Sequence, residues 1–147
     1  MLSYPPGTFI PIAIATHGVV GLAIGYVFDR PVAGLLAGLA PDADFLFPAV
    51  LGWPLVHRGV THAAVALLAL VGIAALTTDR RTLAALTAAY ASHLLIDITT
   101  PKGIPLVYPA LDERLSLDIG IHGHAPEVTL LFWLVGLAVV VAQARST

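Results

Sequence analysis

Three short polar clusters interrupt the apolar sequence, and each contains side chains that commonly bind metal ions. They are Pro41-Asp42-Ala43-Asp44, His57-Arg58-Gly59-Val60-Thr61-His62 and Ser92-His93-Leu94-Leu95-Ile96-Asp97. Imidazole nitrogens and carboxylate oxygens are ligands of zinc, manganese and iron. The sequence has no cysteine, so thiolate ligands are excluded. We therefore expect the three clusters to converge on one metal site.

His93 and Asp97 have the most informative spacing. They are four positions apart, so on a helix they share one face, one turn apart. From there an imidazole and a carboxylate can bind one cation without straining the backbone. The alternative is a histidine that is hydrogen-bonded to its helix partner inside a bundle and needs no metal.

The acidic residues Asp42, Asp44, Asp97 and Glu127 outnumber the nearby cations, of which Arg58 is the obvious one. An ionised carboxylate inside a membrane costs about 2.5 to 3.5 kcal/mol. Two or more divalent cations would cancel the excess charge, whereas protonation would require large upward pKa shifts in several neighbouring acids. For Asp42 and Asp44 the alternative is capping of the next helical segment.

The cluster that contains His57, Arg58 and His62 stands at the start of an apolar run. Arg58 beside a metal site would donate hydrogen bonds to phosphate or carboxylate oxygens, and its alternative role is to anchor the chain at lipid headgroups. Thr61 has the side chain of a helix N-cap, which would fix His62 in the first turn.

The composition predicts the environment of this site. Of the 147 residues, 58% are hydrophobic and only 11% are charged, and the mean hydropathy is +0.90. These values are typical of a polytopic membrane protein, here a single integral membrane domain over residues 1–147. The formal net charge of -2 gives no reason to expect a nucleic-acid partner. Met1–Gly7 lacks Lys and Arg, so the first apolar run is expected to be a retained span rather than a cleaved signal.

The apolar runs predict an all-α, polytopic membrane helical bundle of five transmembrane helices. The predicted spans are Ile10–Phe28, Val32–Leu51, Val60–Thr77, Thr82–Ile98 and a last helix from Pro126 to about Gln143. The second is expected to break at Pro41, and Leu106–Ala125 is expected to form an ordered loop at the interface.

The charged residues between the runs predict the orientation in the inner membrane. One side of the membrane would hold four positive charges and the other three, namely Arg30, Arg80, Arg81 and Arg145 against Arg58, Lys102 and Arg114. The positive-inside rule then gives an outer N-terminus and an inner C-terminus. Counted from the charged turns, the candidate ligands would lie in the outer half of the bilayer or at its outer surface.

Two antiparallel hairpins would place candidate ligands at equal depth. A first hairpin centred between Asp29 and Arg30 pairs His17 with Asp42, and its glycines Gly21, Gly25, Gly34 and Gly38 would allow close helix packing. A second hairpin centred in the Asp79-Arg80 turn pairs His62 with Asp97.

Other residues near these runs are expected to have different roles. His122 and His124 lie in a glycine-containing loop and are expected to be solvated, so Glu127 is the better ligand candidate of that region. Trp53 is expected to anchor the chain at the membrane interface, and Trp133 to face lipid or pack between helices.

In order, spacing and flanking residues, the three clusters and the continuation Ile98–Pro105 resemble the inner-membrane metal-dependent hydrolases, a group that includes a LexA-regulated bacterial member. The resemblance extends from His17 to about Glu127. The resembled family is itself distantly similar to the zinc-dependent phospholipase C and P1-type nuclease group, which hydrolyses phosphate esters. The resemblance implies metal-site roles for His17, Asp42, Asp44, His57, His62, His93, Asp97 and Glu127. It also implies a substrate-binding role for Arg58. The chain departs from the family pattern at Phe45 and Ala63, where histidine and serine are common.

From these features we expect a hydrolase that cleaves a phosphoester in a lipid or lipid-linked substrate with a metal-activated water. Asp42 or Asp44 would orient the water, and Arg58 would stabilise charge on the phosphoryl oxygens. Two or three zinc ions suit the ligand set, with manganese or iron as alternatives. The expected partner is membrane lipid, and the oligomeric state is left open.

Two other classes of function stay open at this point. A metal-ion transporter would use the same ligands as a transit site, but it would need polar residues in the inner halves of the helices, and Leu22–Phe28 and Ala66–Leu76 contain no charged side chain. A non-catalytic membrane protein would use the polar cluster only to stabilise the bundle.

Overall fold

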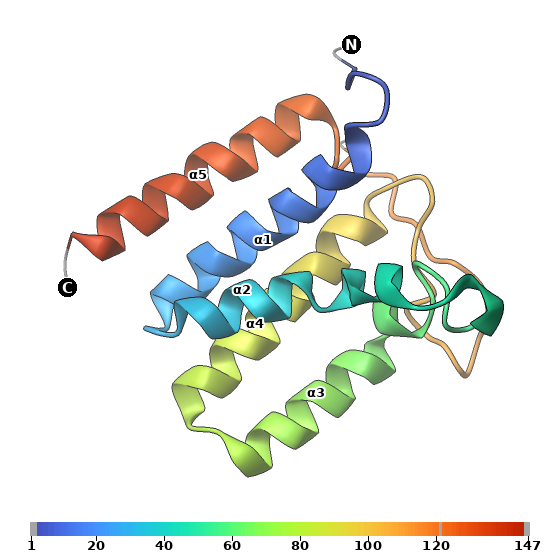
Figure 1. Cartoon of the computed structure of the whole chain (residues 1–147), viewed down its shortest axis with the longest axis horizontal. Coiled ribbons are helices and arrows are strands. Elements are labelled where there is room, and N and C mark those ends of the chain that lie inside the picture. The colour runs from blue at the N-terminus through green and yellow to red at the C-terminus, as the bar shows by residue number, and fades with distance from the viewer. Residues whose placement is uncertain (1–2, 121, 146–147) are drawn as a thin grey trace.

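The structure, a computed structural model, describes residues 3–120 and 122–145, and its regular elements in these ranges are helical (Figure 1). The α-helices are α1 (Phe9–Val27), α2 (Pro31–Leu39), α3 (Ala64–Thr77), α4 (Arg80–Ile98) and α5 (Pro126–Ala144). Three 3-10 helices are η1 (Pro41–Leu46), η2 (Ala49–Leu51) and η3 (Val60–His62). The predicted all-α class is confirmed.

Two of the described helices, α1 and α5, are long and apolar enough to cross a membrane, judged by length and composition. α3 is also apolar but has only 14 residues. The two long helices support a membrane protein, and the five-span arrangement stays a prediction. The apolar side chains of α5 are largely exposed, for example Leu130, Leu131 and Leu134.

Close glycine packing joins α1 and α2, which lie side by side in Figure 1. A Cβ atom added to Gly21 would lie 2.5 Å from the carbonyl oxygen of Gly34 and 2.9 Å from Cα of Gly38. The backbones are therefore in direct contact, as membrane helices with small interface residues commonly are. The predicted packing of the first hairpin is confirmed.

The break at Pro41 is also confirmed. α2 ends at Leu39, and η1 begins at Pro41, because proline lacks the N–H that would continue the helix. In contrast, α3 begins at Ala64 rather than at Val60, and its N-cap position is Ala63, which makes no side-chain cap. The predicted N-cap role of Thr61 is wrong, since its hydroxyl hydrogen-bonds within the polar cluster described below.

Charged side chains connect the two helix turns at the end of the bundle away from the long loops. Arg30 donates to Asp79 at 3.1 Å, and Arg81 donates to Asp29 at 2.5 Å. Asp79 also caps α4 by accepting hydrogen bonds from the backbone N–H groups of Arg81 and Thr82. The backbone N–H of Thr82, with help from Arg30, holds the pKa of Asp79 well below its usual range.

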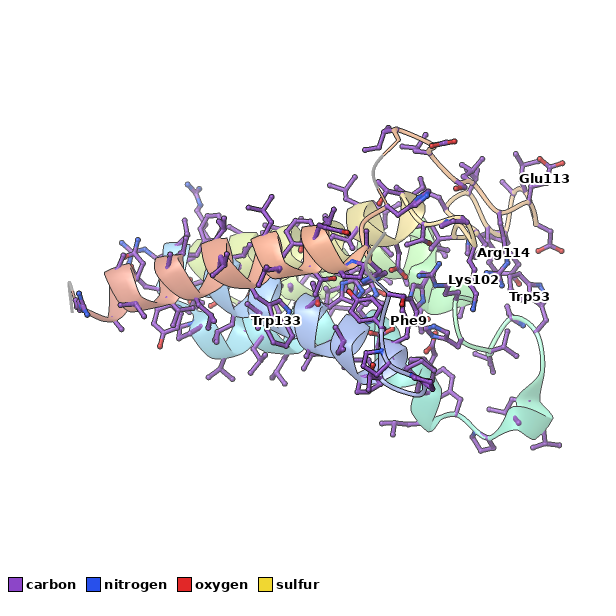
Figure 2. All side chains as sticks on the ribbon, turned by 90° about the horizontal axis from the view of Figure 1, so that it is seen from above. Phe9, Trp53, Lys102, Glu113, Arg114 and Trp133 are labelled. Carbon is purple, nitrogen blue, oxygen red and sulfur yellow. The ribbon has the colours of Figure 1, made fainter. Side chains whose placement is uncertain are left out.

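At the other end, the loops extend beyond the helices. Figure 2 shows Trp53, Lys102, Glu113 and Arg114 on these loops, whereas Trp133 lies along α5. The indole of Trp133 donates to the Thr16 hydroxyl of α1 at 2.9 Å, which identifies it as a packing residue.

Candidate metal centre

Polar side chains from five regions of the chain meet at the loop end of the bundle. α1 supplies His17, η1 supplies Asp42 and Asp44, the following loop and η3 supply His57, Arg58 and His62, α4 supplies His93 and Asp97, and the loop before α5 supplies His124. All of them are buried except His57, whose side chain is 38% exposed. The structure thus brings together the residues that the sequence clusters predict, with Glu127 as the exception.

Two imidazole nitrogens of this cluster lie at similar distances from each other and from two carboxylate oxygens. Nε2 of His62 is 3.3 Å from Nε2 of His93, 3.4 Å from Oδ2 of Asp97 and 3.7 Å from Oδ1 of Asp42. Nε2 of His93 is 3.8 Å from the same Asp97 oxygen and 3.7 Å from the same Asp42 oxygen. Atoms bound to one tetrahedral zinc ion at about 2.0 to 2.1 Å are roughly 3.3 Å apart. The ligand atoms of His62, His93 and Asp97 therefore fit one zinc-sized ion after a small contraction, with the Asp42 oxygen 3.7 Å from both imidazoles.

The hydrogen-bond partners of Nδ1 in His93 and His62 show that this nitrogen carries a proton in both rings. Nδ1 of His93 lies 2.7 Å from the carbonyl oxygen of Gly38, which only accepts, so this nitrogen carries the proton. Nδ1 of His62 lies 3.0 Å from the hydroxyl of Thr61 and 3.3 Å from Asp44. Because the Thr61 hydroxyl donates to Asp44, Nδ1 of His62 is the donor there. Nε2 of each ring is then the nitrogen that faces the other ring and the carboxylates, and a cation shared there would suit both rings.

Asp44 supports the neighbouring residues. Its Oδ1 accepts from Nδ1 of His57 at 3.0 Å, and its Oδ2 accepts from the backbone N–H of Arg58 at 3.0 Å and from the Thr61 hydroxyl at 2.8 Å. Donors therefore occupy both of its oxygens. Carboxylates in this position fix the orientation of metal-binding imidazoles. The geometry favours this supporting role over the predicted role of Asp44 as a direct ligand.

Several groups of possible ligands overlap in the cluster. Among the described residues, the groups of three whose ligand atoms lie within 4.8 Å of one another are His17-Asp42-His93, His17-Asp97-His124, Asp42-His57-His62 and His62-His93-Asp97. Asp42 and Asp97 each belong to two groups, as does each of His17, His62 and His93. Shared ligands of this kind are compatible with more than one ion.

His124 is a residue of this cluster that the sequence analysis assigned to solvent. Its side chain is buried, and its Nε2 lies 2.9 Å from Oδ1 of Asp97. Because a carboxylate accepts, Nε2 carries the proton and Nδ1 presents a lone pair. Nδ1 of His124 and Nδ1 of His17 are both buried without a hydrogen-bond partner among the described residues. Nε2 of His17 also lies near the same Asp97 oxygen, at 3.4 Å, so the two imidazoles and this carboxylate form one of the possible ligand groups.

Glu127 lies outside these ligand groups. It is in the first turn of α5, and its residue is exposed. His124, three residues earlier, is the candidate ligand that this region supplies, in place of the predicted Glu127. The signal that could have identified His124 is its position just before α5, at the same end of the bundle as the other ligands.

Arg58 is fixed by hydrogen bonds on the protein side of the site. Its guanidinium lies 2.9 Å from Asp97, and it donates to the hydroxyl of Thr100 at 2.6 Å and to the carbonyl of Gly103 at 3.3 Å. Its backbone has a φ of 60°, which a residue other than glycine adopts only when its surroundings hold it there. Arg58 therefore orients Asp97 in addition to lining the cavity.

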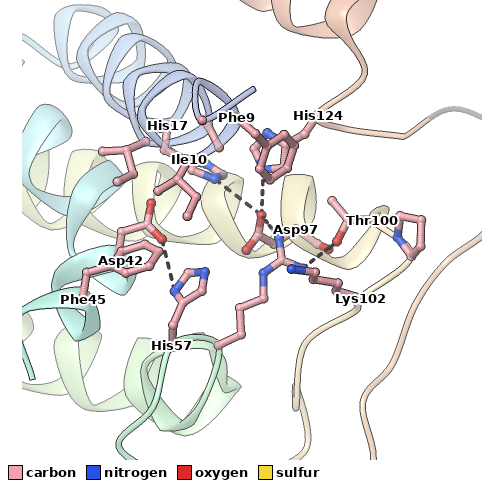
Figure 3. Close-up of a pocket in the computed structure, with 15 residues that line it drawn as sticks. Phe9, Ile10, His17, Asp42, Phe45, His57, Asp97, Thr100, Lys102 and His124 are labelled. Atoms are coloured by element: carbon pink, nitrogen blue, oxygen red, sulfur yellow. Dashed lines mark hydrogen bonds and ion pairs between the residues drawn. The ribbon is translucent and has the colours of Figure 1, made fainter. Parts of the chain in front are cut away.

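A cavity of about 510 Å³ opens onto the cluster (Figure 3). One wall is apolar and comes mainly from the first turns of α1. The other walls carry the polar side chains. The lining residues are Gly7, Phe9, Ile10, Ala13, Ile14, His17, Asp42, Phe45, His57, Arg58, Asp97, Thr100, Pro101, Lys102 and His124. Phe45, where the resembled family often has histidine, stacks on His57 with ring centroids 3.9 Å apart.

Comparison with known proteins locates the chain among membrane proteins. Residues 12–147 match the family model described as YdjM inner membrane protein. No curated protein and no solved structure matches the chain, so the similarity to zinc-dependent phospholipase C and P1-type nucleases stays a prediction. Since the family match covers nearly the whole sequence, the chain belongs to the YdjM inner membrane protein family.

Proposed function

We propose that the protein is a membrane-bound, metal-dependent hydrolase of a phosphoester in a lipid or lipid-linked substrate. The observation that carries the proposal is the pair of Nε2 atoms of His62 and His93, which lie 3.3 Å apart and are flanked by two carboxylates. A buried arrangement of this kind is unfavourable without a cation. It is the arrangement expected of ligands that share one ion.

The residues that would hold the first ion are His62, His93 and Asp97, with Asp42 beside them. A second ion would use His17 and His124 together with Asp97, or His57 together with Asp42 and His62. Imidazole and carboxylate ligands suit zinc, with manganese or iron as alternatives. When bound, divalent cations supply Lewis acidity and lower the pKa of a water molecule.

The remaining residues of the cavity would bind and orient the ester. Arg58 and Lys102 line the cavity as cations and would stabilise negative charge on the phosphoryl oxygens. Asp42 lines the same cavity and would orient the attacking water and accept its proton. Asp44 is less suited to this step than the sequence analysis suggests, because donors occupy both of its oxygens.

We further propose that the protein crosses the inner membrane five times and that the site opens to the outer face. α1 and α5 support two spans. The turns that contain Arg30 and Arg81 lie at one end of the helices, and the metal cluster lies at the other, near the loops. The positive-inside count then assigns the turns to the cytoplasmic side.

The experiment that tests the hydrolase is a measurement of metal content per chain and of phosphoester cleavage in detergent-purified protein. We expect two or three zinc-like ions per chain, fewer in an Asp97→Ala variant that remains folded, and cleavage that is lost with the metal. A metal that binds without any phosphoester cleavage would favour the transporter. A cluster that binds no metal even after addition of zinc or manganese would favour a purely structural role.

A further inference from the structure

We propose that an apolar groove between α1 and α2 binds the acyl chain of an anionic lipid whose phosphate lies in the metal-site cavity. The inference rests on the proposed function and specifies its substrate class. It selects an amphiphilic phosphoester over a water-soluble one.

The groove is a second cavity, of about 460 Å³, and it is lined only by apolar residues and one glycine. These are Pro11, Ile14, Ala15, Gly18, Val19, Leu22, Leu35 and Leu39. Ile14 lines this groove and also lines the metal-site cavity. The two cavities therefore adjoin, so one molecule could occupy both.

The order of the two cavities along α1 matches the order of headgroup and tail in a lipid leaflet. The metal-site cavity includes Phe9 and Ile10 at the start of α1, at the loop end of the bundle. The α1 residues of that cavity end at His17, whereas those of the groove end at Leu22, so the groove extends five residues further, about 7.5 Å at ~1.5 Å per residue. A lipid with its phosphate at the cluster would then direct its chain toward the middle of the bilayer.

The charges of the cavity suit a phosphate headgroup. Arg58 is held by Asp97, Thr100 and Gly103, whereas Lys102 makes no hydrogen bond or ion pair with any residue that the structure describes. Lys102 is also exposed at the loop end of the molecule, where it can reach an anion (Figure 2). A lysine ammonium is a compact point charge that binds phosphate oxygens well.

The groove is expected to fix the position of the lipid phosphate more than to raise the affinity for the lipid. Lipid tails are about as apolar as leucine, so moving an acyl chain from lipid into the groove releases little free energy. A chain held along α1 nevertheless fixes the phosphate relative to the metal ligands, and small errors in that position reduce a reaction rate strongly.

Gly18 offers a direct test, because a side chain there would fill the groove. A Cβ atom at Gly18 would lie 3.4 Å from Cδ2 of Leu39 and 3.5 Å from Cδ1 of Leu35, which are ordinary contacts with flexible side chains. Gly18→Leu should therefore block the groove without a backbone clash. Gly72→Leu is the matched control, since a Cβ atom at Gly72 of α3 meets nothing within 4 Å.

The readout compares two phosphomonoesters that differ only in the acyl chain, palmitoyl lysophosphatidate and glycerol 3-phosphate, on zinc-loaded protein in detergent. We expect the ratio of their kcat/KM values to fall at least tenfold in Gly18→Leu and to stay at the wild-type value in Gly72→Leu. If Gly18→Leu does not fold, Leu35→Phe fills the same groove from α2. An unchanged ratio in the folded variant would overturn the proposal.

A binding measurement separates failure of the groove from failure of the hydrolase. Lysophosphatidate with a diazirine at the end of its acyl chain is irradiated with the wild-type protein, and the labelled peptides are identified by mass spectrometry. We expect the label on the α1 and α2 residues of the groove, and we expect Gly18→Leu to remove it. Label spread equally over α3 and α5 would refute the groove even in an active enzyme. Groove labelling without hydrolysis of either ester would instead refute the proposed function alone.

Discussion

Nε2 of His62 lies 3.3 Å from Nε2 of His93, and the other nitrogen of each ring is already used as a hydrogen-bond donor. The two rings come from opposite arms of the second hairpin, one from η3 before α3 and the other from α4. Each has the outer hydrogen bond that metal-binding histidines normally make, His93 to a backbone carbonyl and His62 toward Thr61 and Asp44. This relationship leads directly to the first prediction.

Replacing His93 by alanine should remove at least one bound metal ion per chain, because His93 belongs to two of the groups of closely spaced ligand atoms. Chelation with EDTA should lower the thermal unfolding midpoint of the wild-type protein and should have a smaller effect on His93→Ala. A ligand present at a hundred times its Kd stabilises a protein by about 2.7 kcal/mol. Elemental mass spectrometry and a thermal scan check both statements. The control is His122→Ala, which changes an exposed histidine outside the ligand groups; equal metal content in both variants would contradict the assignment.

Gly21→Ala should destabilise the protein by about 1 to 3 kcal/mol, the usual cost of overpacking. The added methyl group would meet the backbone of Gly34 and Gly38, so α1 and α2 would have to separate. His17 would then move away from Asp42. The matched control Gly72→Ala, in open space on α3, should be neutral or stabilising by roughly 0.5 to 1 kcal/mol, as expected for alanine in a helix. Reversible unfolding in mixed micelles measures the free energy of unfolding of both variants, and metal content is measured beside it. Equal free energies of unfolding for Gly21→Ala and Gly72→Ala would contradict the packing argument.

Arg58→Ala should cost about 3 to 5 kcal/mol in metal-free protein, because it leaves the buried carboxylate of Asp97 without its cationic partner. Added zinc should recover part of the lost stability, since a cation bound to Asp97 replaces some of the missing charge. Thermal unfolding with and without zinc measures both effects. Arg114→Ala removes an exposed arginine from the loop and is expected to change the midpoint little. Identical midpoints for the two variants would show that the Arg58–Asp97 pair has no structural role.

The Asp79 carboxylate predicts a pH dependence at the other end of the bundle. Its folded-state pKa is held below the ordinary value of 3.8, so its stabilising contribution is fully present above that value. The contribution decreases as the pH falls below about 4 toward the folded-state pKa. The difference in unfolding midpoint between wild type and Asp79→Asn should therefore be largest near neutral pH and should shrink in acid. Asp112→Asn, on the opposite loop, serves as the control. A difference in unfolding midpoint between wild type and Asp79→Asn that stayed constant down to pH 3 would contradict this prediction.

The membrane orientation can be tested because the native chain contains no cysteine. Leu111→Cys places a thiol on the long loop near the site, and Thr78→Cys places one in the turn between α3 and α4; both positions are exposed. A membrane-impermeant maleimide should label Leu111→Cys in intact cells with a permeabilised outer membrane, and Thr78→Cys only after the inner membrane is opened. The reverse pattern would place the site in the cytoplasm.

The sequence was sufficient for those parts of the site that helical periodicity determines. His93 and Asp97 share a helix face, and the glycines of the first hairpin bring His17 near Asp42, both of which the structure shows. It was not sufficient for residues whose position depends on loops. His124 reaches Asp97 because Gly123 packs against the backbone of Ile96, and a Cβ atom at that glycine would lie 2.6 Å from the Ile96 carbonyl oxygen.

The start of α3 and the role of Asp44 could not be predicted for a related reason. Thr61 resembles an N-cap in isolation, but its hydroxyl hydrogen-bonds to Asp44, which is 17 positions away in the sequence. A local pattern contains no information about such a distant acceptor. Asp44 looks like a ligand from its type and its neighbours, and only the three-dimensional arrangement shows that donors already occupy its oxygens.

The ion pairs between the two charged turns imply an order of assembly. In the five-span arrangement that we propose, each hairpin would insert into the bilayer as a separate unit, since α1 with α2 and α3 with α4 are each joined by a short turn. The ligands, however, are divided, with His17 and Asp42 on the first hairpin and His62, His93 and Asp97 on the second. Arg30–Asp79 and Arg81–Asp29 connect the two hairpins at one end and need no metal to form. In the function that we propose, metal capture at the other end would complete the docking, so the bound ion would act as a cross-link between the two halves as well as a reagent.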